Sequence, residues 1–192
     1  MTERSWRWVW LPDLGEGAEA FAFRATDHGY EARGAVTATL DGAPLDASYL
    51  VETDTSWRTG HVRVDVKGGG TLEILSDGAG HWRRADGTAL PDLDGCLDPD
   101  ISMTPFTNTV AIRRLGSRVG EAAEIKVAYI LVPELTLRAA PQRYTHLSRQ
   151  LWRFDGLDID FTADITVDED GFVVEYPGLF RRQLQTPAGR HI

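Results

Sequence analysis

Apolar and polar residues alternate along most of the chain, and a period of two is typical of β-strands that bury one face. In residues 6–10 three tryptophans share one face, while Arg7 and Val9 occupy the other. The same alternation recurs in residues 30–40, 62–66, 125–131 and 157–167. Turn signals such as Asp41-Gly42 separate these runs, which favours antiparallel hairpins. The pattern predicts a mainly β protein with an antiparallel, strongly curled sheet or a partly open barrel.

Helical periodicity is weak, and short helices are expected only near residues 144–151 and 178–184. Small residues recur at alternate positions in two predicted strands. They are Ala18, Ala20 and Ala22 in one strand and Ala32, Gly34 and Ala38 in the other. Small side chains suit the concave face of a curved sheet or the approach of a ligand. Close packing of a helix or a second sheet is an equally good explanation.

Composition narrows the classes of function. The 192 residues suit one domain, 1–192, and 29 acidic against 20 basic residues give a net charge of −9. This charge argues against a large phosphate-neutralising surface, so nucleic acid is not an expected partner. A single cysteine excludes an intrachain disulfide and a zinc site with several thiolates. No apolar run is long enough for a transmembrane helix, and the first ten residues do not resemble a signal peptide, so the expected compartment is the cytoplasm.

Residues 80–115 break the alternation and concentrate ionisable groups. Asp98 and Asp100 lie near Arg113 and Arg114 in the sequence, with Asn108, the only asparagine, between them. Opposite charges are costly to bury unless they are paired, which predicts one network of these four charged residues joined to the loop that holds Asn108. Two alternatives stay open: a divalent cation held by this aspartate-rich segment, and a polar rim around the mouth of a ligand site.

Several motifs carry a resemblance that covers most of the chain. They are GHWR around Trp82, GCLDPDIS at 95–102, TPFTNT at 104–109, IRRL at 112–115, QRYTHL near Tyr144 and DEDGFVVEYPGLFRR at 168–182. In these motifs the chain resembles a bacterial family of unknown function known as the putative glycolipid-binding family. Ala111 stands where a proline is expected and Pro99 where an aliphatic residue is expected. The resemblance implies a spiral β-roll around an apolar interior, similar in shape to the periplasmic lipoprotein carriers.

The resulting hypothesis is a protein that holds a lipid or glycolipid inside a curled sheet. The candidate ligand-binding residues are Trp82, Arg83, Asp98, Asp100, Asn108, Arg113, Arg114 and Tyr144. No catalytic residue, metal or cofactor is assigned. The alternatives are an enzyme that uses the Asp/Asn/Arg cluster of residues 98–114, and an interaction module whose edge strands pair with a partner. Cys96 beside His81 or His146 could also serve as a nucleophile.

Overall fold

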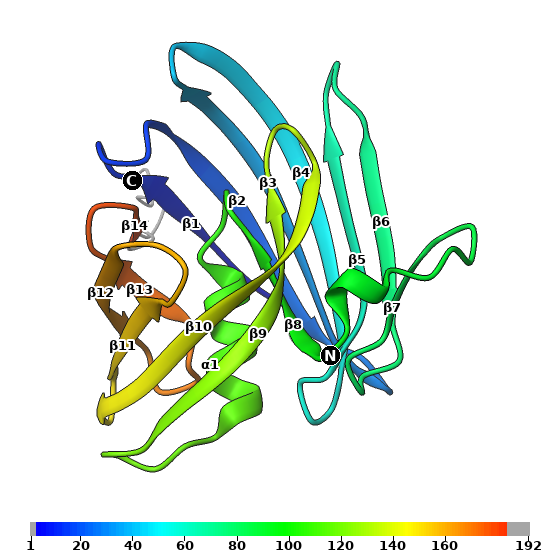
Figure 1. Cartoon of the computed structure of the whole chain (residues 1–192). Coiled ribbons are helices and arrows are strands. Elements are labelled where there is room, and N and C mark those ends of the chain that lie inside the picture. The colour runs from blue at the N-terminus through cyan, green and yellow to red at the C-terminus, as the bar shows by residue number, and fades with distance from the viewer. Residues whose placement is uncertain (1–2, 184–192) are drawn as a thin grey trace.

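The computed structural model describes residues 3–183, and fourteen strands within them form one sheet (Figure 1). In chain order the strands are β1 (Glu3–Trp10), β2 (Glu16–Ala25), β3 (Gly29–Leu40), β4 (Ala43–Asp54), β5 (Thr59–Val66), β6 (Thr71–Ser76), β7 (Trp82–Arg84), β8 (Cys96–Ile101), β9 (Ala122–Leu131), β10 (Thr136–Ser148), β11 (Leu151–Gly156), β12 (Phe161–Val167), β13 (Val173–Tyr176) and β14 (Phe180–Gln183). A 3-10 helix, η1 (Pro91–Leu93), precedes β8, and helix α1 (Phe106–Leu115) follows it.

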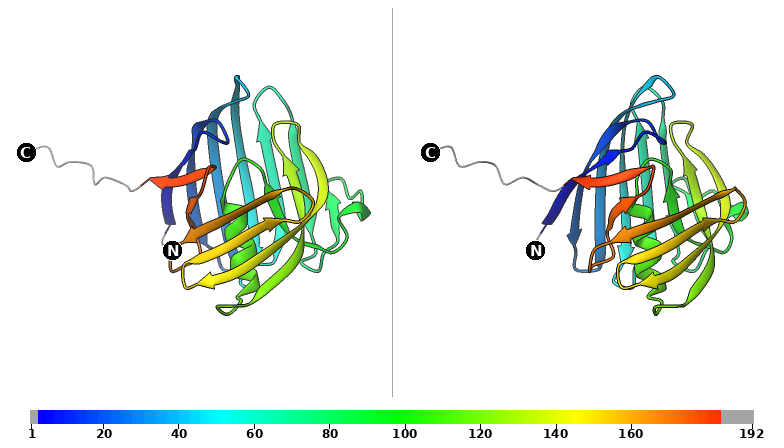
Figure 2. Two further views of the ribbon diagram at one scale, coloured as in Figure 1. Left: turned by 60° about the vertical axis from the view of Figure 1, so that its left-hand side comes forward. Right: turned by 90° about the vertical axis from the view of Figure 1, so that its left-hand side faces the viewer.

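The sheet is curled and is not closed into a barrel. Its strand order is β7-β6-β5-β4-β3-β2-β1-β14-β13-β12-β11-β10-β9-β8, so the pairing of β1 with β14 joins the N-terminal and C-terminal halves. The sheet curls until β8, at one edge, lies against β5, the third strand from the other edge (Figure 2). These features confirm the predicted mainly β, curled and open sheet.

One neighbouring pair is parallel, whereas the others are antiparallel. β8 and β9 run in the same direction, with Pro99 opposite Ala128 and Ile101 opposite Ile130. A parallel pair requires a crossover that returns the chain to the starting end of the first strand. Residues 102–121 make this crossover, and α1 within them lies inside the curl of the sheet (Figure 1). The topology therefore places the longest helix of the described chain in the interior.

Helix α1 occupies a segment that the sequence pattern had indicated as irregular. Its first seven residues are all buried, so it has no polar stripe, and the helical period is absent from its sequence. Gly116 ends the helix in the left-handed conformation, at φ 55°.

The two short helices predicted elsewhere are wrong. Residues 144–148 belong to β10, where a bulge between His146 and Ser148 disturbs the alternation. Residues 180–183 form β14 after a turn at Gly178, and residue 184 lies outside the described residues. The strand predicted over residues 157–167 begins only at Phe161, because the chain turns tightly after Gly156, where a Cβ would lie 2.5 Å from Ile159.

The inner face of the sheet carries the hydrophobic core. Trp8 is fully buried and Trp10 nearly so, which confirms that the first strand buries its tryptophan face. The small residues predicted in β3 also face inward. In β2 the prediction is wrong: Glu19, Phe21 and Phe23 are buried, so the three alanines between and beside them lie on the opposite face. None of the helices in residues 3–183 is long and apolar enough to cross a membrane.

Candidate functional site

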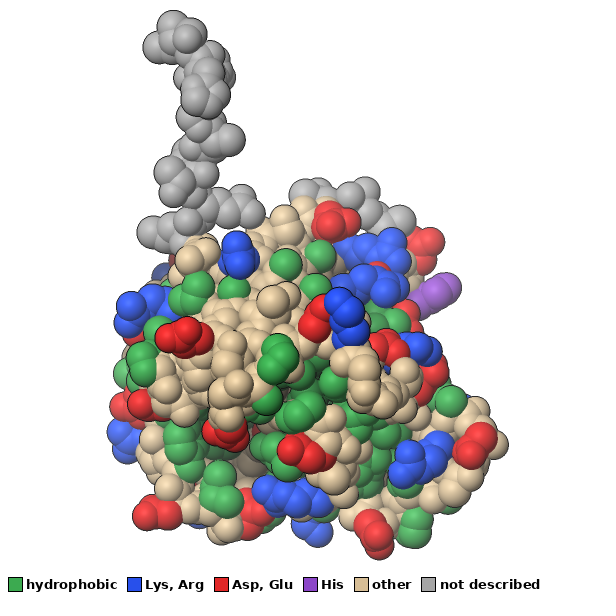
Figure 3. Space-filling view, turned by 90° about the horizontal axis from the view of Figure 1, so that it is seen from above, with side chains coloured by type: hydrophobic (Ala, Val, Ile, Leu, Met, Phe, Trp, Pro, Cys, Tyr) green, Lys and Arg blue, Asp and Glu red, His purple; other side chains and the backbone are tan. Residues whose placement is uncertain are grey.

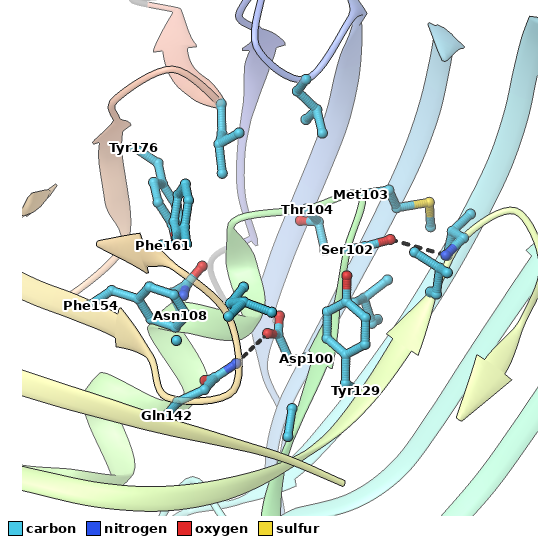
Figure 4. Close-up of a pocket in the computed structure, with 18 of the residues that line it drawn as sticks. Asp100, Ser102, Met103, Thr104, Asn108, Tyr129, Gln142, Phe154, Phe161 and Tyr176 are labelled. Carbon is cyan, nitrogen blue, oxygen red and sulfur yellow. Dashed lines mark hydrogen bonds between the residues drawn. The ribbon is translucent and has the colours of Figure 1, made fainter. Parts of the chain in front are cut away.

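The curled sheet encloses a cavity of about 320 Å³, the pocket drawn in Figure 4. Its walls are mainly apolar and aromatic side chains, among them Trp10, Leu40, Met103, Phe154, Phe161 and Phe180. Two further lining residues, Leu131 and Ile159, are 38% and 53% exposed, so the mouth lies beside them. Figure 3 looks onto the molecule from above, where hydrophobic side chains gather around a hollow. The cavity is thus an apolar space that opens at one end of the roll.

One wall of the cavity carries a network of polar side chains. Gln142 Nε2 donates a hydrogen bond of 2.6 Å to Asp100 Oδ2 (Figure 4). The Thr107 hydroxyl donates one of 3.1 Å to Asp100 Oδ1. Burial raises the pKa of Asp100, and these two hydrogen bonds act in the opposite direction. Asn108 Nδ2 donates to the Tyr144 hydroxyl at 2.9 Å, and this hydroxyl donates to Gln142 Oε1 at 3.4 Å. Asp100, Asn108 and Gln142 line the cavity, whereas Tyr144 holds Asn108 in place.

Asp98 and Arg114 form a buried ion pair close to this network. Arg114 donates from Nε and Nη2 to the two carboxylate oxygens of Asp98, both at 2.6 Å. The Asp98 side chain is completely buried, and that of Arg114 is 15% exposed. Burial raises the pKa of Asp98, and the Arg114 guanidinium opposes this shift. The predicted pairing is confirmed for these two residues, which tie the last turn of α1 to β8.

The other charged members of the predicted network lie apart. Arg113 is exposed, places its guanidinium 5.0 Å from the ring centre of Trp57 and donates to the backbone oxygen of Asp170. Asp100 bonds to Thr107 and Gln142, as described above. The single four-residue network is therefore wrong: successive helix residues point in different directions, so Arg113 reaches Trp57 and Asp170 while Arg114 reaches Asp98.

Trp82 and Arg83 are not among the cavity-lining residues. The Trp82 indole is buried and donates a hydrogen bond of 2.7 Å to the Cys96 backbone oxygen, while Arg83 is exposed in the edge strand β7. Burial raises the pKa of the Cys96 thiol to about 11, which disfavours the thiolate that a nucleophile requires. His81 bonds to Asp77 and His146 to the Ser117 backbone oxygen. The structure gives no support to a cysteine nucleophile.

Sequence reasoning overlooked several residues of the cavity. Gln142 shares the inward face of β10 with Ala140 and Tyr144, so the alternation could have identified it. Arg138 pairs with Asp158 near the mouth, and its guanidinium lies 4.8 Å from the ring centre of Tyr129. The Tyr129 contact crosses the hairpin of β9 and β10, and the Asp158 contact joins β10 to the turn after β11, so the period of a single strand indicates neither.

A second buried acid, Glu19 of β2, lies behind the cavity wall. The Tyr49 hydroxyl donates to Glu19 Oε1 at 2.5 Å and lies 3.0 Å from the hydroxyl of Thr104, which lines the cavity. Gly34 leaves room for this contact, because a Cβ there would lie 2.6 Å from Glu19 Oε1. Glu19 Oε2 has no hydrogen-bond partner among residues 3–183. Burial raises the pKa of Glu19 from 4.5 to about 8.

Comparison with known proteins yields a family and one solved structure. A family model described as "Putative glycolipid-binding" matches residues 7–182. The chain is also similar to the crystal structure of a DUF1089 family protein from Pseudomonas aeruginosa, with 40% sequence identity and a TM-score of 0.78. The match covers 86% of this chain and 92% of that chain. No curated protein matches.

The buried ion pair predicts unequal effects for two adjacent arginines. Arg114→Leu leaves the Asp98 carboxylate buried without its partner, so we expect the free energy of unfolding to fall by about 3–5 kcal/mol. Arg113→Leu, the matched control on the exposed side of α1, should cost less than about 1 kcal/mol. Urea denaturation of both variants measures the difference. Equal losses would contradict the structural role of the Asp98–Arg114 pair.

Glu19 predicts a pH dependence of stability. Its pKa is higher in the folded chain than the ordinary 4.5, so its contribution to stability is complete below about pH 4.5 and is lost as the pH rises through about 8. The loss is on the order of 5 kcal/mol, because each pKa unit corresponds to about 1.36 kcal/mol. Glu19→Gln should remove this decline in denaturation measured across the pH range. Glu16→Gln, at an exposed position of the same strand, should retain it; a decline that survives in Glu19→Gln would refute the assignment.

Proposed function

The chain belongs to the putative glycolipid-binding family, and from this premise we propose that its interior cavity binds the apolar part of one amphiphile, a lipid or glycolipid. The observation that carries the proposal is a cavity of about 320 Å³ whose apolar walls meet one polar patch. This volume lies at the lower end of the roughly 300–1,000 Å³ of small-molecule sites. The cavity therefore suits a single chain, or part of one, better than a whole lipid with two long tails.

The apolar walls supply the affinity in this proposal. Phe154 and Phe161 come from neighbouring strands β11 and β12, and Trp10 comes from β1 on the other side of the cavity. Transfer of a methylene group from water to such surroundings contributes about 0.8 kcal/mol. Because the mouth residues Leu131 and Ile159 are also apolar, the tail can continue along them to the surface beside the Arg138–Asp158 ion pair.

The polar patch supplies selectivity. Each Asp100 carboxyl oxygen accepts one hydrogen bond from the protein and has capacity for another, so a ligand hydroxyl can donate to it. Trp10 lines the cavity, and its buried indole N–H, which has no partner among the described residues, is the candidate donor to a ligand oxygen. We infer that the ligand places a hydroxyl-bearing or ester-bearing group against this patch. The patch lies inside the cavity, whereas the sequence had suggested a polar rim at its mouth.

The candidate ligand-binding residues named from the sequence fall into those at the cavity and those away from it. In this proposal Asp100 and Asn108 contact the ligand together with Gln142, and Tyr144 orients Asn108. Asp98 and Arg114 support the wall. Ligand contacts by Trp82, Arg83 and Arg113 stay predictions, as does the cytoplasmic compartment.

The proposal predicts affinity that grows with chain length. For alkyl glucosides of increasing length, each kept below its micellar concentration, affinity should rise by up to about fourfold per methylene until the cavity is full. Quenching or enhancement of tryptophan fluorescence reports binding, because Trp10 lines the cavity.

A pair of variants makes this titration specific. Ala140 lines the cavity, so Ala140→Phe should fill it and lower affinity at least tenfold, on the order of 1.4 kcal/mol. Ala35→Phe, on the exposed outer face of β3, should bind like the unaltered chain. Absence of binding below high micromolar concentration, or equal binding by both variants, would contradict a lipid site in the cavity and favour the interaction module.

A further inference from the structure

Glu19, Tyr49 and Thr104 form a line of hydrogen-bonding groups from a buried carboxyl to the cavity wall. They come from β2, β4 and the turn before α1, respectively. The Tyr49 hydroxyl lies 2.5 Å from Glu19 Oε1 and 3.0 Å from the Thr104 hydroxyl. Thr104 is the member of this line that lines the cavity, and it appears there in Figure 4. The line therefore connects a titratable group with the surface that a ligand would touch.

The number of protons fixes the direction of these hydrogen bonds. A tyrosine or threonine hydroxyl carries one proton, and an ionised carboxylate carries none. When Glu19 is ionised, Tyr49 donates to it, so the contact between the two hydroxyls requires Thr104 to donate to Tyr49. Thr104 also accepts the backbone N–H of Phe106 at 3.1 Å. In this state Thr104 has no proton left for the cavity.

The opposite direction requires a protonated Glu19. When the acid proton lies on Oε1, it is donated to Tyr49, Tyr49 donates to Thr104, and the Thr104 oxygen accepts from both Tyr49 and the Phe106 N–H. The Thr104 proton is now free to be donated to a ligand oxygen. The change of state forms one bond, the O–H of Glu19, with a proton taken up from solvent; the Tyr49 and Thr104 hydrogens stay on their oxygens and only reorient.

The side chains around Glu19 are apolar, so its protonation depends on its burial and on its contacts with Tyr49 and Thr104. Its neighbours across the strands are Trp8 in β1 and Val36 in β3, and Phe106 of α1 stacks near the Tyr49 ring. Burial is the largest cause of the raised pKa of Glu19, and the hydrogen bonds of Tyr49 and Thr104 lower it. Among the described residues, Tyr49 is the one titratable group that acts on it, and no charged side chain does.

We propose that Glu19, Tyr49 and Thr104 are a proton-linked relay that lets the cavity wall donate a hydrogen bond to a carbonyl oxygen of the ligand while Glu19 is protonated. This proposal rests on the proposed function of the cavity and adds a subsite to it. The ligand class is an amphiphile with an uncharged ester linkage next to its tail. A ligand that accepts this hydrogen bond binds the protonated state of Glu19 more tightly, and by linkage it raises the pKa of Glu19. Binding at a pH near that pKa therefore takes up protons.

The test uses a monoacylglycerol, which contains one ester carbonyl and does not ionise. We expect its affinity for the unaltered chain to fall about tenfold from about pH 6 to about pH 9.5, within the usual range of coupling between two binding events. Glu19→Gln should bind equally at both pH values, because its amide keeps an N–H donor and cannot ionise. Glu16→Gln, at an exposed position of the same strand, should retain both the affinity and the pH dependence of the unaltered chain.

Calorimetry of the unaltered chain gives a second readout that needs no variant. Binding at about pH 8 in two buffers of different ionisation enthalpy should show uptake of a fraction of a proton. Binding that is independent of pH and takes up no proton would overturn the relay and leave the lipid site intact. A pH dependence that persists in Glu19→Gln would have the same consequence. Failure of the monoacylglycerol and the alkyl glucosides to bind at any pH would instead contradict the proposed function.

Discussion

Helix α1 lies inside the curled sheet with its first seven residues buried, and each polar group that it carries needs a hydrogen-bond partner within the protein. Thr107 donates to Asp100, Asn108 donates to Tyr144, and the Thr109 hydroxyl accepts the backbone N–H of Val173. At the other end of the helix Arg114 pairs with Asp98. This requirement explains why threonine, asparagine and aspartate gather in two short motifs of an otherwise apolar interior.

The same requirement shapes the cavity. A sheet that curls until β8 meets β5 encloses more space than its own side chains fill, and α1 occupies part of that space. The groups that satisfy the helix, Asp100 and Gln142 in particular, also face the remaining space. Glu19 and Tyr49 meet the wall from the opposite side through Thr104. Residues that stabilise the interior therefore also define the chemistry that a ligand would meet.

Local pattern predicted the sheet well because a half-buried strand has the same period wherever it lies. It failed for α1, since a helix buried on all sides shows no amphipathic stripe, and for β2, where alanines and aromatic residues were both suitable for the inner face. In the candidate site it placed Asp98 near Arg114 but could not distinguish Arg113 from its neighbour. Gln142 and Glu19 depend on contacts across the sheet, which periodicity does not encode.

The most direct test of an amphiphile site in the cavity is native mass spectrometry of the chain purified from its own host without detergent. We expect one bound molecule to appear as a discrete added mass, with fragments that contain an acyl or alkyl chain. The same preparation of the Ala140→Phe variant should lack it. The mass of the bare chain alone, unchanged after incubation with lipids extracted from the host, would contradict the proposal that this cavity holds a lipid.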